Sequence, residues 1–339
     1  KFAIIFTSVL FLSIGPLLAV PRTAATTFEV SINPFFPAIP AWVVILAYFI
    51  INIVLVLKRS SIIDTIGKFL TPALIIILVV LIIKGIFMPI GTISQNNDTG
   101  VFAYSLLEGY QTMDALAALL FAAIITSSIK NKGYKGKEMS KVLLIGSLVA
   151  VIGLAFVYGG ITYIGAQTSG LVSGDINKTS LLVLIAKNVL GSAGPILIGV
   201  AMALACLTTS IGLITAGADY FETITKGKLS YKFNVLAISI VSFTVALLGV
   251  DNIVVFSSPI LNLLYPVSIT IIVFALLHKH IKIKAGRLGV YTSLVFSILL
   301  LIPGLNLNFL PLASIGFGWL LPTALAMIIG QLVFKNENK

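Results

Sequence analysis

The amino-acid sequence predicts an all-α protein, a polytopic membrane helical bundle, because of its composition and its long apolar runs. Of its 339 residues, 58% are hydrophobic and only 10% are charged, and the mean hydropathy is +1.12. Soluble domains are roughly 45–50% apolar. About 20 consecutive apolar residues cross the hydrocarbon core of a bilayer as a helix, and ten stretches of the chain fit that description.

Short polar connections join these ten stretches, so residues 1–339 are expected to form a single transmembrane domain. The predicted spans are 2–20, 41–57, 70–88, 114–129, 142–166, 196–217, 234–250, 259–277, 286–303 and 312–334. The longest connections, 21–40, 89–100 and 167–195, all fall on one side. Within the last of them, residues 180–190 have helical periodicity, which predicts an amphipathic helix over the external mouth or a surface helix with no gating role.

The basic residues indicate how the chain crosses the membrane. The net charge is +11, and of the 22 Lys and Arg only Arg22, Lys84, Lys178 and Lys187 fall on the side of the long connections. Cytoplasmic loops carry the excess of Lys and Arg. We therefore expect a multi-pass protein of the cell (inner) membrane with both termini in the cytoplasm. The basic residues then orient the chain in the membrane and do not indicate nucleic-acid binding.

Motifs for catalysis are absent from the sequence. It has no phosphate-binding glycine loop and no zinc-protease motif, and both histidines, His278 and His280, lie in one basic loop. The single cysteine, Cys206, lies in a predicted span, so no intrachain disulfide can form. The sequence predicts no enzyme and no organic cofactor, which leaves a pathway across the membrane.

The polar segment 107–116 interrupts an apolar run that extends from 101 to 129. Glu108, Gly109, Gln111 and Asp114 stand where a spanning helix would be uniformly apolar. Hydrocarbon offers no water to freed backbone groups, so a broken helix persists only where protein buries it or where it lines a cavity. The segment is a candidate binding site, unless 101–113 is an external loop and Asp114 only caps the helix that follows.

A second polar cluster, at 205–210, ends in three consecutive hydroxyl residues inside the span 196–217. Hydroxyl and carbonyl oxygens are hard ligands of the kind that an alkali cation prefers. Serine and threonine in such helices also bond back to the carbonyl four residues earlier, so packing is the alternative role.

A third element lies at the end of the first predicted span. Pro16 follows Gly15 and lacks a backbone donor, so we expect a kink near the external end of that helix. Arg22 is expected at the interface, either extending toward the headgroups or forming a gate or a structural ion pair.

Two motifs together resemble the branched-chain amino acid:cation symporter family (the LIVCS or BrnQ-type carriers). They are residues 15–24 with 28–30, and residues 108–117, and the similarity extends along the whole chain. The resemblance implies a LeuT-type core of two inverted five-helix repeats within twelve helices. The ten spans would then match family helices three to twelve, and the first two helices, with their part of the binding site, would be absent.

The resemblance also implies a function, namely sodium-driven uptake of leucine, isoleucine and valine. The implied substrate-binding residues are Glu108, Gly109, Tyr110, Gln111, Thr112 and Asp114; the implied sodium ligands are Ala205, Thr209 and Ser210; the implied gate or structural residues are Gly15, Pro16 and Arg22. Two rivals remain: a proton-coupled carrier or exporter of the same superfamily, and a non-transporting membrane receptor or assembly subunit.

Overall fold

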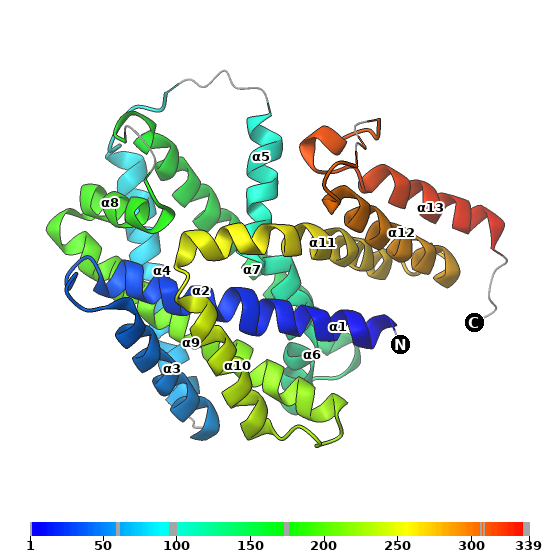
Figure 1. The fold of residues 1–339 in the computed structure, drawn as a ribbon, viewed down its shortest axis with the longest axis horizontal. Coiled ribbons are helices and arrows are strands. Elements are labelled where there is room, and N and C mark those ends of the chain that lie inside the picture. The colour runs from blue at the N-terminus through cyan, green and yellow to red at the C-terminus, as the bar shows by residue number, and fades with distance from the viewer. Residues whose placement is uncertain are drawn as a thin grey trace. The chain divides into compact units, whose positions relative to one another are not determined.

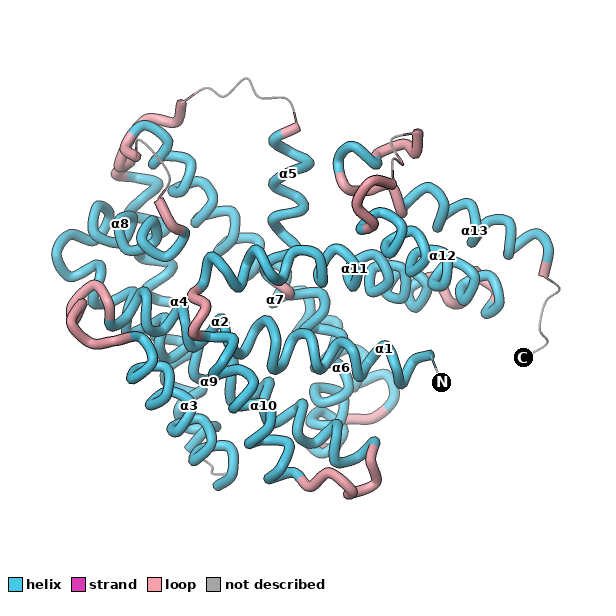
Figure 2. Tube along the Cα trace, in the orientation of Figure 1, coloured by secondary structure: helices cyan, strands magenta, loops and turns pink. Residues whose placement is uncertain are grey.

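A computed structural model of the chain describes residues 2–58, 62–94, 100–172, 176–305, 307 and 309–334. All regular secondary structure in these residues is helical (Figure 2). Four residues that contribute to the charge argument lie outside the described residues, namely Lys1, Arg59, Lys335 and Lys339. The chain forms two compact units, a first unit of Lys1–Asn96 with Ala123–Ile253 and a second unit of Asn97–Ala122 with Val254–Lys339.

Each of the ten predicted spans overlaps a helix (Figure 1). The α-helices are α1 Phe2–Leu12, α2 Val20–Thr26, α3 Ala41–Lys58, α4 Ile62–Phe87, α5 Val101–Glu108, α6 Asp114–Asn131, α7 Gly136–Ala166, α8 Lys178–Leu190, α9 Gly194–Ile224, α10 Tyr231–Ala246, α11 Val250–Leu276, α12 Ile283–Leu301 and α13 Leu320–Val333. Within the described residues, six helical stretches are long and apolar enough to cross a membrane, or seven if the bent pair Val101–Ala122 and Ile125–Asn131 counts as one. Three shorter apolar helices, Thr71–Phe87, Tyr231–Ala246 and Leu320–Val333, accompany them. The protein is therefore a multi-pass helical membrane protein.

The first predicted connection is wrong, because the helix does not end at residue 20. Helical structure continues from Phe2 to Ile32 through two π-helical segments, Ser13–Ala19 and Thr27–Ile32. The backbone N–H of Val20 bonds to the carbonyl of Gly15, five residues earlier. Pro16 lies inside this segment, so the wider π turn absorbs the proline and the helix goes on.

The predicted connection between the spans 234–250 and 259–277 is also wrong in extent. Helix α11 already begins at Val250 and contains both Pro259 and Pro266. Proline is tolerated inside membrane helices because neighbouring side chains satisfy the carbonyls that it frees. The last predicted span is shorter than expected, since α13 begins only at Leu320.

The core of the first unit joins the end of the long first helical run to α4, α7, α8 and α9. Its buried members are Val30, Leu81, Ile82, Ile164, Ile185, Ala186, Val189 and Ile198. Glycines let the backbones approach closely, since a Cβ on Gly160 would overlap Ile82 and one on Gly199 would lie 3.2 Å from the Cα of Ser31. Small residues play this role wherever membrane helices cross.

In the second unit, α12 and α13 pack through small residues in the same way. A Cβ on Gly330 would lie 2.8 Å from the Cα of Ala285, and one on Gly289 would overlap the Met327 side chain. These two glycines therefore set how closely α12 and α13 approach each other.

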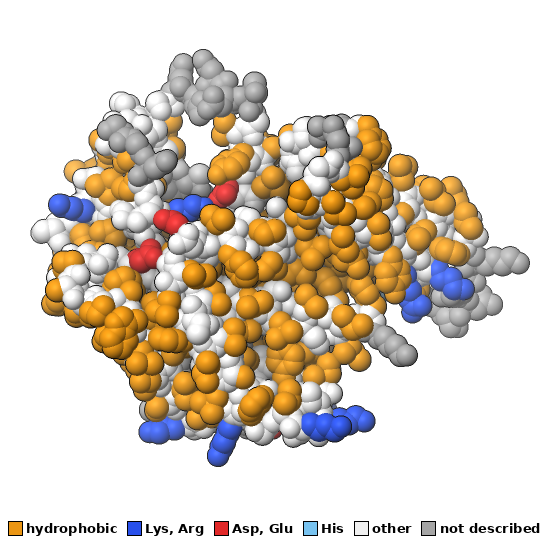
Figure 3. Space-filling model, in the orientation of Figure 1, with side chains coloured by type: hydrophobic (Ala, Val, Ile, Leu, Met, Phe, Trp, Pro, Cys, Tyr) orange, Lys and Arg blue, Asp and Glu red, His pale blue; other side chains and the backbone are white. Residues whose placement is uncertain are grey.

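Apolar side chains cover most of the face of the molecule in view (Figure 3). On α7, Leu144, Leu148 and Ile152 are all more than half exposed. Lipid tails are as apolar as these side chains, so a bilayer accommodates a surface that water would penalise.

Candidate functional site

The interruption expected around residues 107–116 is present in the second unit. Helix α5 ends at Glu108, a 3-10 turn covers Gly109–Thr112, and α6 begins at Asp114. Between them Met113 has a left-handed backbone with φ of 59°, which L-residues other than glycine rarely adopt. Residues Val101–Glu108 form a helix and not an irregular loop.

Hydrogen bonds within the interruption and to α11 fix its shape. The hydroxyl of Thr112 donates to the carbonyl of Gly109 at 2.8 Å. The Gln111 amide group donates to the Ser258 hydroxyl at 2.7 Å and accepts from the Ser257 hydroxyl at 2.9 Å. Both ends of one amide are thus used to tie the break to α11.

The carboxylates and the aromatic ring of the interruption occupy different environments. Glu108 and Asp114 are half-buried, and Asp114 lies in the first turn of α6. A helix N-terminus carries about half a positive charge, which stabilises an anionic group placed there. Tyr110 is buried and stacks on Tyr265 of α11, with ring centroids 4.1 Å apart and planes 3° from parallel.

The hydroxyl cluster on α9 belongs to the first unit and divides into two parts. The hydroxyls of Thr208 and Thr209 each donate to the carbonyl of Ala205 at 2.9 Å, which is the local back-bonding considered above. Thr209 is exposed, whereas Ser210 is fully buried. Helix α9 by itself therefore places the Thr209 hydroxyl against the Ala205 carbonyl, while Ser210 faces the interior.

Ser210 takes part in a buried polar network with α3. The Tyr48 hydroxyl donates to the Ser210 hydroxyl at 2.9 Å, Ser210 donates to the Asn52 side-chain oxygen, and the Asn52 amide donates to the Tyr48 carbonyl at 2.9 Å. Sequence reasoning missed Tyr48 and Asn52. The available signal was a lone asparagine in the otherwise apolar helix α3, since buried polar groups require partners.

Glu29, which lies in the motif 28–30 and was given no role from the sequence, connects two other helices. One carboxylate oxygen accepts the Thr179 hydroxyl at 2.7 Å near the start of α8, and the other accepts the Val250 N–H at 2.8 Å at the start of α11. The first N–H groups of a helix have no partner within it. Glu29 thus holds the N-terminal ends of two helices with one negative charge, and we call this arrangement the Glu29 clasp.

The residues proposed for a gate lie along the first helical run. Gly15 and Pro16 are buried, and Arg22 is half-buried in α2. Pro21, five residues after Pro16, has no N–H with which to complete a π-type bond to the Pro16 carbonyl. The buried hydroxyl of Ser242 donates to that carbonyl at 3.4 Å, so α10 supplies the donor that the backbone lacks.

Among the described residues, no group of three or more His, Cys, Asp or Glu side chains gathers to hold a metal ion. The oxygen ligands available on α9 are instead neutral hydroxyls and carbonyls, which suit an alkali cation better than a transition metal.

The chain resembles known transport proteins over nearly its whole length. A family model described as "Branched-chain amino acid transport protein" matches residues 1–337. The branched-chain amino acid permease BraB of Bacillus subtilis (strain 168) is 35% identical, over 98% of this chain and 79% of that protein. A putative branched-chain amino acid carrier protein of Staphylococcus aureus (strain USA300) is 36% identical, over 98% of this chain and 80% of its own length. No solved structure matches the chain.

These relatives are named as a permease and a carrier and not as enzymes, in agreement with the lack of catalytic motifs in the sequence. By whole-length similarity, the chain belongs to the branched-chain amino acid transport protein family.

Proposed function

We propose that the protein carries leucine, isoleucine and valine into the cell, driven by inward flow of sodium. The single observation that supports a carrier is the interruption of the α5 to α6 run at Gly109–Met113, with a carboxylate on each side of it. Broken helices in transporters present their polar ends to a travelling solute. We infer the preference for substrates with branched side chains only from the family to which the chain belongs.

In this proposal the interruption receives the charged ends of the amino acid. The positive end of α6 meets the substrate carboxylate, while Glu108 or Asp114 meets the ammonium group. Gly109, Tyr110, Gln111 and Thr112 hold the backbone in place, as their hydrogen bonds and ring stacking suggest.

Asp114→Asn tests the substrate part of the proposal. We expect it to impair uptake strongly while the protein still inserts normally, because the amide lacks the charge that attracts the ammonium group. Asp251→Asn is the matched control, since Asp251 is an exposed carboxylate in the first turn of α11. Equal uptake by the two variants would remove Asp114 from the site.

For the coupling ion, we propose that the Ala205 carbonyl and the Thr209 hydroxyl, with Ser210 behind them, bind sodium. The first two oxygens already lie 2.9 Å apart. Thr209→Ala and Ser210→Ala should each raise the sodium concentration needed for half-maximal uptake. Thr208→Ala serves as control because its hydroxyl donates to the same carbonyl at the same distance; an identical sodium curve in all three variants would assign these hydroxyls to packing.

Proton coupling is the second candidate, favoured by the two carboxylates that flank the interruption. Radiolabelled leucine uptake by the complete protein in proteoliposomes, with sodium and proton gradients imposed separately, distinguishes the candidates. We expect accumulation with a sodium gradient alone. Accumulation that follows only the proton gradient would assign coupling to Glu108 or Asp114, and no flux under either gradient would favour a receptor or assembly subunit.

We further propose a LeuT-type fold with ten spans and cytoplasmic termini, and a gating role for Arg22 on a helix shaped by Gly15 and Pro16. The ten predicted stretches, each overlapping a helix, and the distribution of basic residues support this arrangement. In a Cys206→Ser background, a cysteine placed at Lys228 should react with a membrane-impermeant maleimide only from inside, and one at Lys178 only from outside. The reverse pattern would invert the topology.

A further inference from the structure

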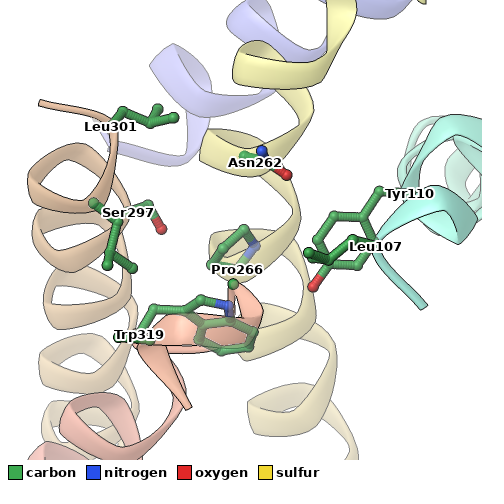
Figure 4. Close-up of a pocket in the computed structure, with 10 residues that line it drawn as sticks. Leu107, Tyr110, Asn262, Pro266, Ser297, Leu301 and Trp319 are labelled. Atoms are coloured by element: carbon green, nitrogen blue, oxygen red, sulfur yellow. The ribbon is translucent and has the colours of Figure 1, made fainter. Parts of the chain in front are cut away.

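The second unit contains a cavity of about 130 Å³ on the far side of Tyr110 from its backbone (Figure 4). Its walls come from the end of α5, from α11 and α12, and from the segment that leads into α13. A water molecule needs roughly 10–15 Å³ of such space, so this cavity is large enough for a small organic molecule.

Two buried polar atoms of the cavity wall have no hydrogen-bond partner. They are the hydroxyl of Tyr110 and the indole nitrogen of Trp319, on side chains that are only 8% and 4% exposed. Figure 4 shows both side chains directed toward the space between α11 and α12. A buried donor without an acceptor costs about 1–3 kcal/mol, so an occupant that supplied an acceptor oxygen would be bound favourably.

The remaining walls define what that occupant can be. Leu107, Pro266, Leu300 and Leu301 are apolar, and no charged side chain lines the cavity. The Ser297 hydroxyl already donates to the Ser293 carbonyl at 2.6 Å, so Ser297 can only accept. A charged ligand would remain uncompensated here, whereas a neutral molecule would not.

We propose that this cavity is a second ligand site, which binds a small neutral molecule with a short aliphatic body and a carbonyl or hydroxyl oxygen. The oxygen accepts hydrogen bonds from Trp319 and Tyr110, and the aliphatic body contacts the leucines and Pro266. Asn262, an exposed amide on the cavity wall, offers both a donor and an acceptor for a second polar group. The cavity shares Tyr110 with the interruption proposed to bind substrate, but the test below measures binding of a neutral probe and not uptake, so it can fail without the proposed transport failing.

Tryptophan fluorescence provides a direct test, because the chain has only two tryptophans. Trp42→Phe removes the exposed one on α3 and leaves Trp319 as the reporter in the cavity. Isovaleramide is the neutral probe, and isovalerate has the same skeleton with a negative charge. In lipid nanodiscs we expect a saturable change in emission with isovaleramide and at least tenfold weaker binding of isovalerate.

Two tyrosine variants locate the probe. Tyr110→Phe removes the hydroxyl and should weaken isovaleramide about tenfold, equivalent to about 1.4 kcal/mol. Tyr104→Phe, an exposed tyrosine on the same helix α5, should leave binding unchanged. Labelling of the buried Cys206 thiol on heating checks that the first unit is folded in every variant, and the emission spectrum of Trp319 without probe checks the second unit.

Three results would overturn the proposal. An emission change that rises in proportion to concentration would indicate solvent quenching and a cavity filled only with water. Equal binding by the Tyr110 and Tyr104 variants would place the probe elsewhere. Isovalerate binding as tightly as isovaleramide would contradict the uncharged chemistry of the walls.

Discussion

Replacement of Glu29 should destabilise the first unit by an amount that its hydrogen bonds allow us to estimate. Each oxygen of the carboxylate accepts one bond, from the Thr179 hydroxyl at 2.7 Å and from the Val250 N–H at 2.8 Å. Hydrogen bonds to charged groups contribute about 1.5–3 kcal/mol each. Glutamine is neutral, and although its amide N–H can donate to the Thr179 hydroxyl, both bonds then fall to the roughly 0.5–1.5 kcal/mol of an uncharged hydrogen bond. Glu29→Gln should therefore lower the free energy of unfolding by about 1.5–3 kcal/mol.

Thr179→Val measures how much of the loss passes through the Thr179 bond. In Glu29→Gln this bond is already reduced to an uncharged one, and the Thr179 hydroxyl can still donate to the Asn177 side-chain oxygen at 3.1 Å. The double variant should therefore lose less stability than the sum of the two single variants, with a coupling energy of about 1 kcal/mol or more. Independent sites instead add within about 0.3–0.5 kcal/mol.

The protein supplies its own unfolding reporter. Cys206 is the single cysteine and is 8% exposed, so a thiol-reactive dye labels it only when α9 is disrupted. Equilibrium unfolding in mixed micelles, followed by this labelling, gives the stability of each variant. Glu138→Gln is the control because Glu138 is an exposed glutamate in the first turn of α7. Two results would show that the Glu29 clasp does not stabilise the protein. One is additive stability losses for the Glu29 and Thr179 variants, and the other is a loss for Glu29→Gln no larger than that for Glu138→Gln.

Three further substitutions should lower stability in the same assay. Asn52→Leu leaves the buried Ser210 hydroxyl with only the Leu207 carbonyl as acceptor, at 3.1 Å, and should cost about 1–3 kcal/mol. A neutral effect would mean that the network contributes nothing to stability. Gly249→Ala places a methyl group on a backbone with φ of 80° and should lower the free energy of unfolding by about 1–2 kcal/mol. Unchanged stability of this variant would contradict the expected strain. Gly194→Ala drives a Cβ into the Ala186 carbonyl of α8 and should cost about 3 kcal/mol or more, whereas Gly153→Ala on α7 meets no atom within 4 Å and should be tolerated.

The positions of the helices could be read from the sequence because the bilayer imposes a simple rule. Every span needs an apolar stretch of a fixed length, and that requirement is local. For the same reason the interruption at Gly109–Met113 was visible in advance: a glycine, an amide and two carboxylates have no place in an intact spanning helix. The motifs at 15–24 with 28–30 and at 108–117 also indicated the correct family.

The sequence alone could not predict where the helices that contain proline end. Whether Pro16 and Pro21 end a helix or are absorbed by a π segment depends on another element, and here Ser242 of α10 supplies the donor to the Pro16 carbonyl. Pro259 and Pro266 likewise lie inside α11, although a proline in a sequence commonly indicates a boundary.

The sequence by itself determined that this is a helical membrane protein, where its apolar helices run and which segment interrupts one of them. Only the tertiary structure decided which polar side chains meet. Ser210 and Asn52 are 158 positions apart, and Glu29 and Val250 are 221 apart. The physical reason is that apolar length is a property of one segment, whereas a hydrogen bond in the interior exists only when packing brings two distant segments together.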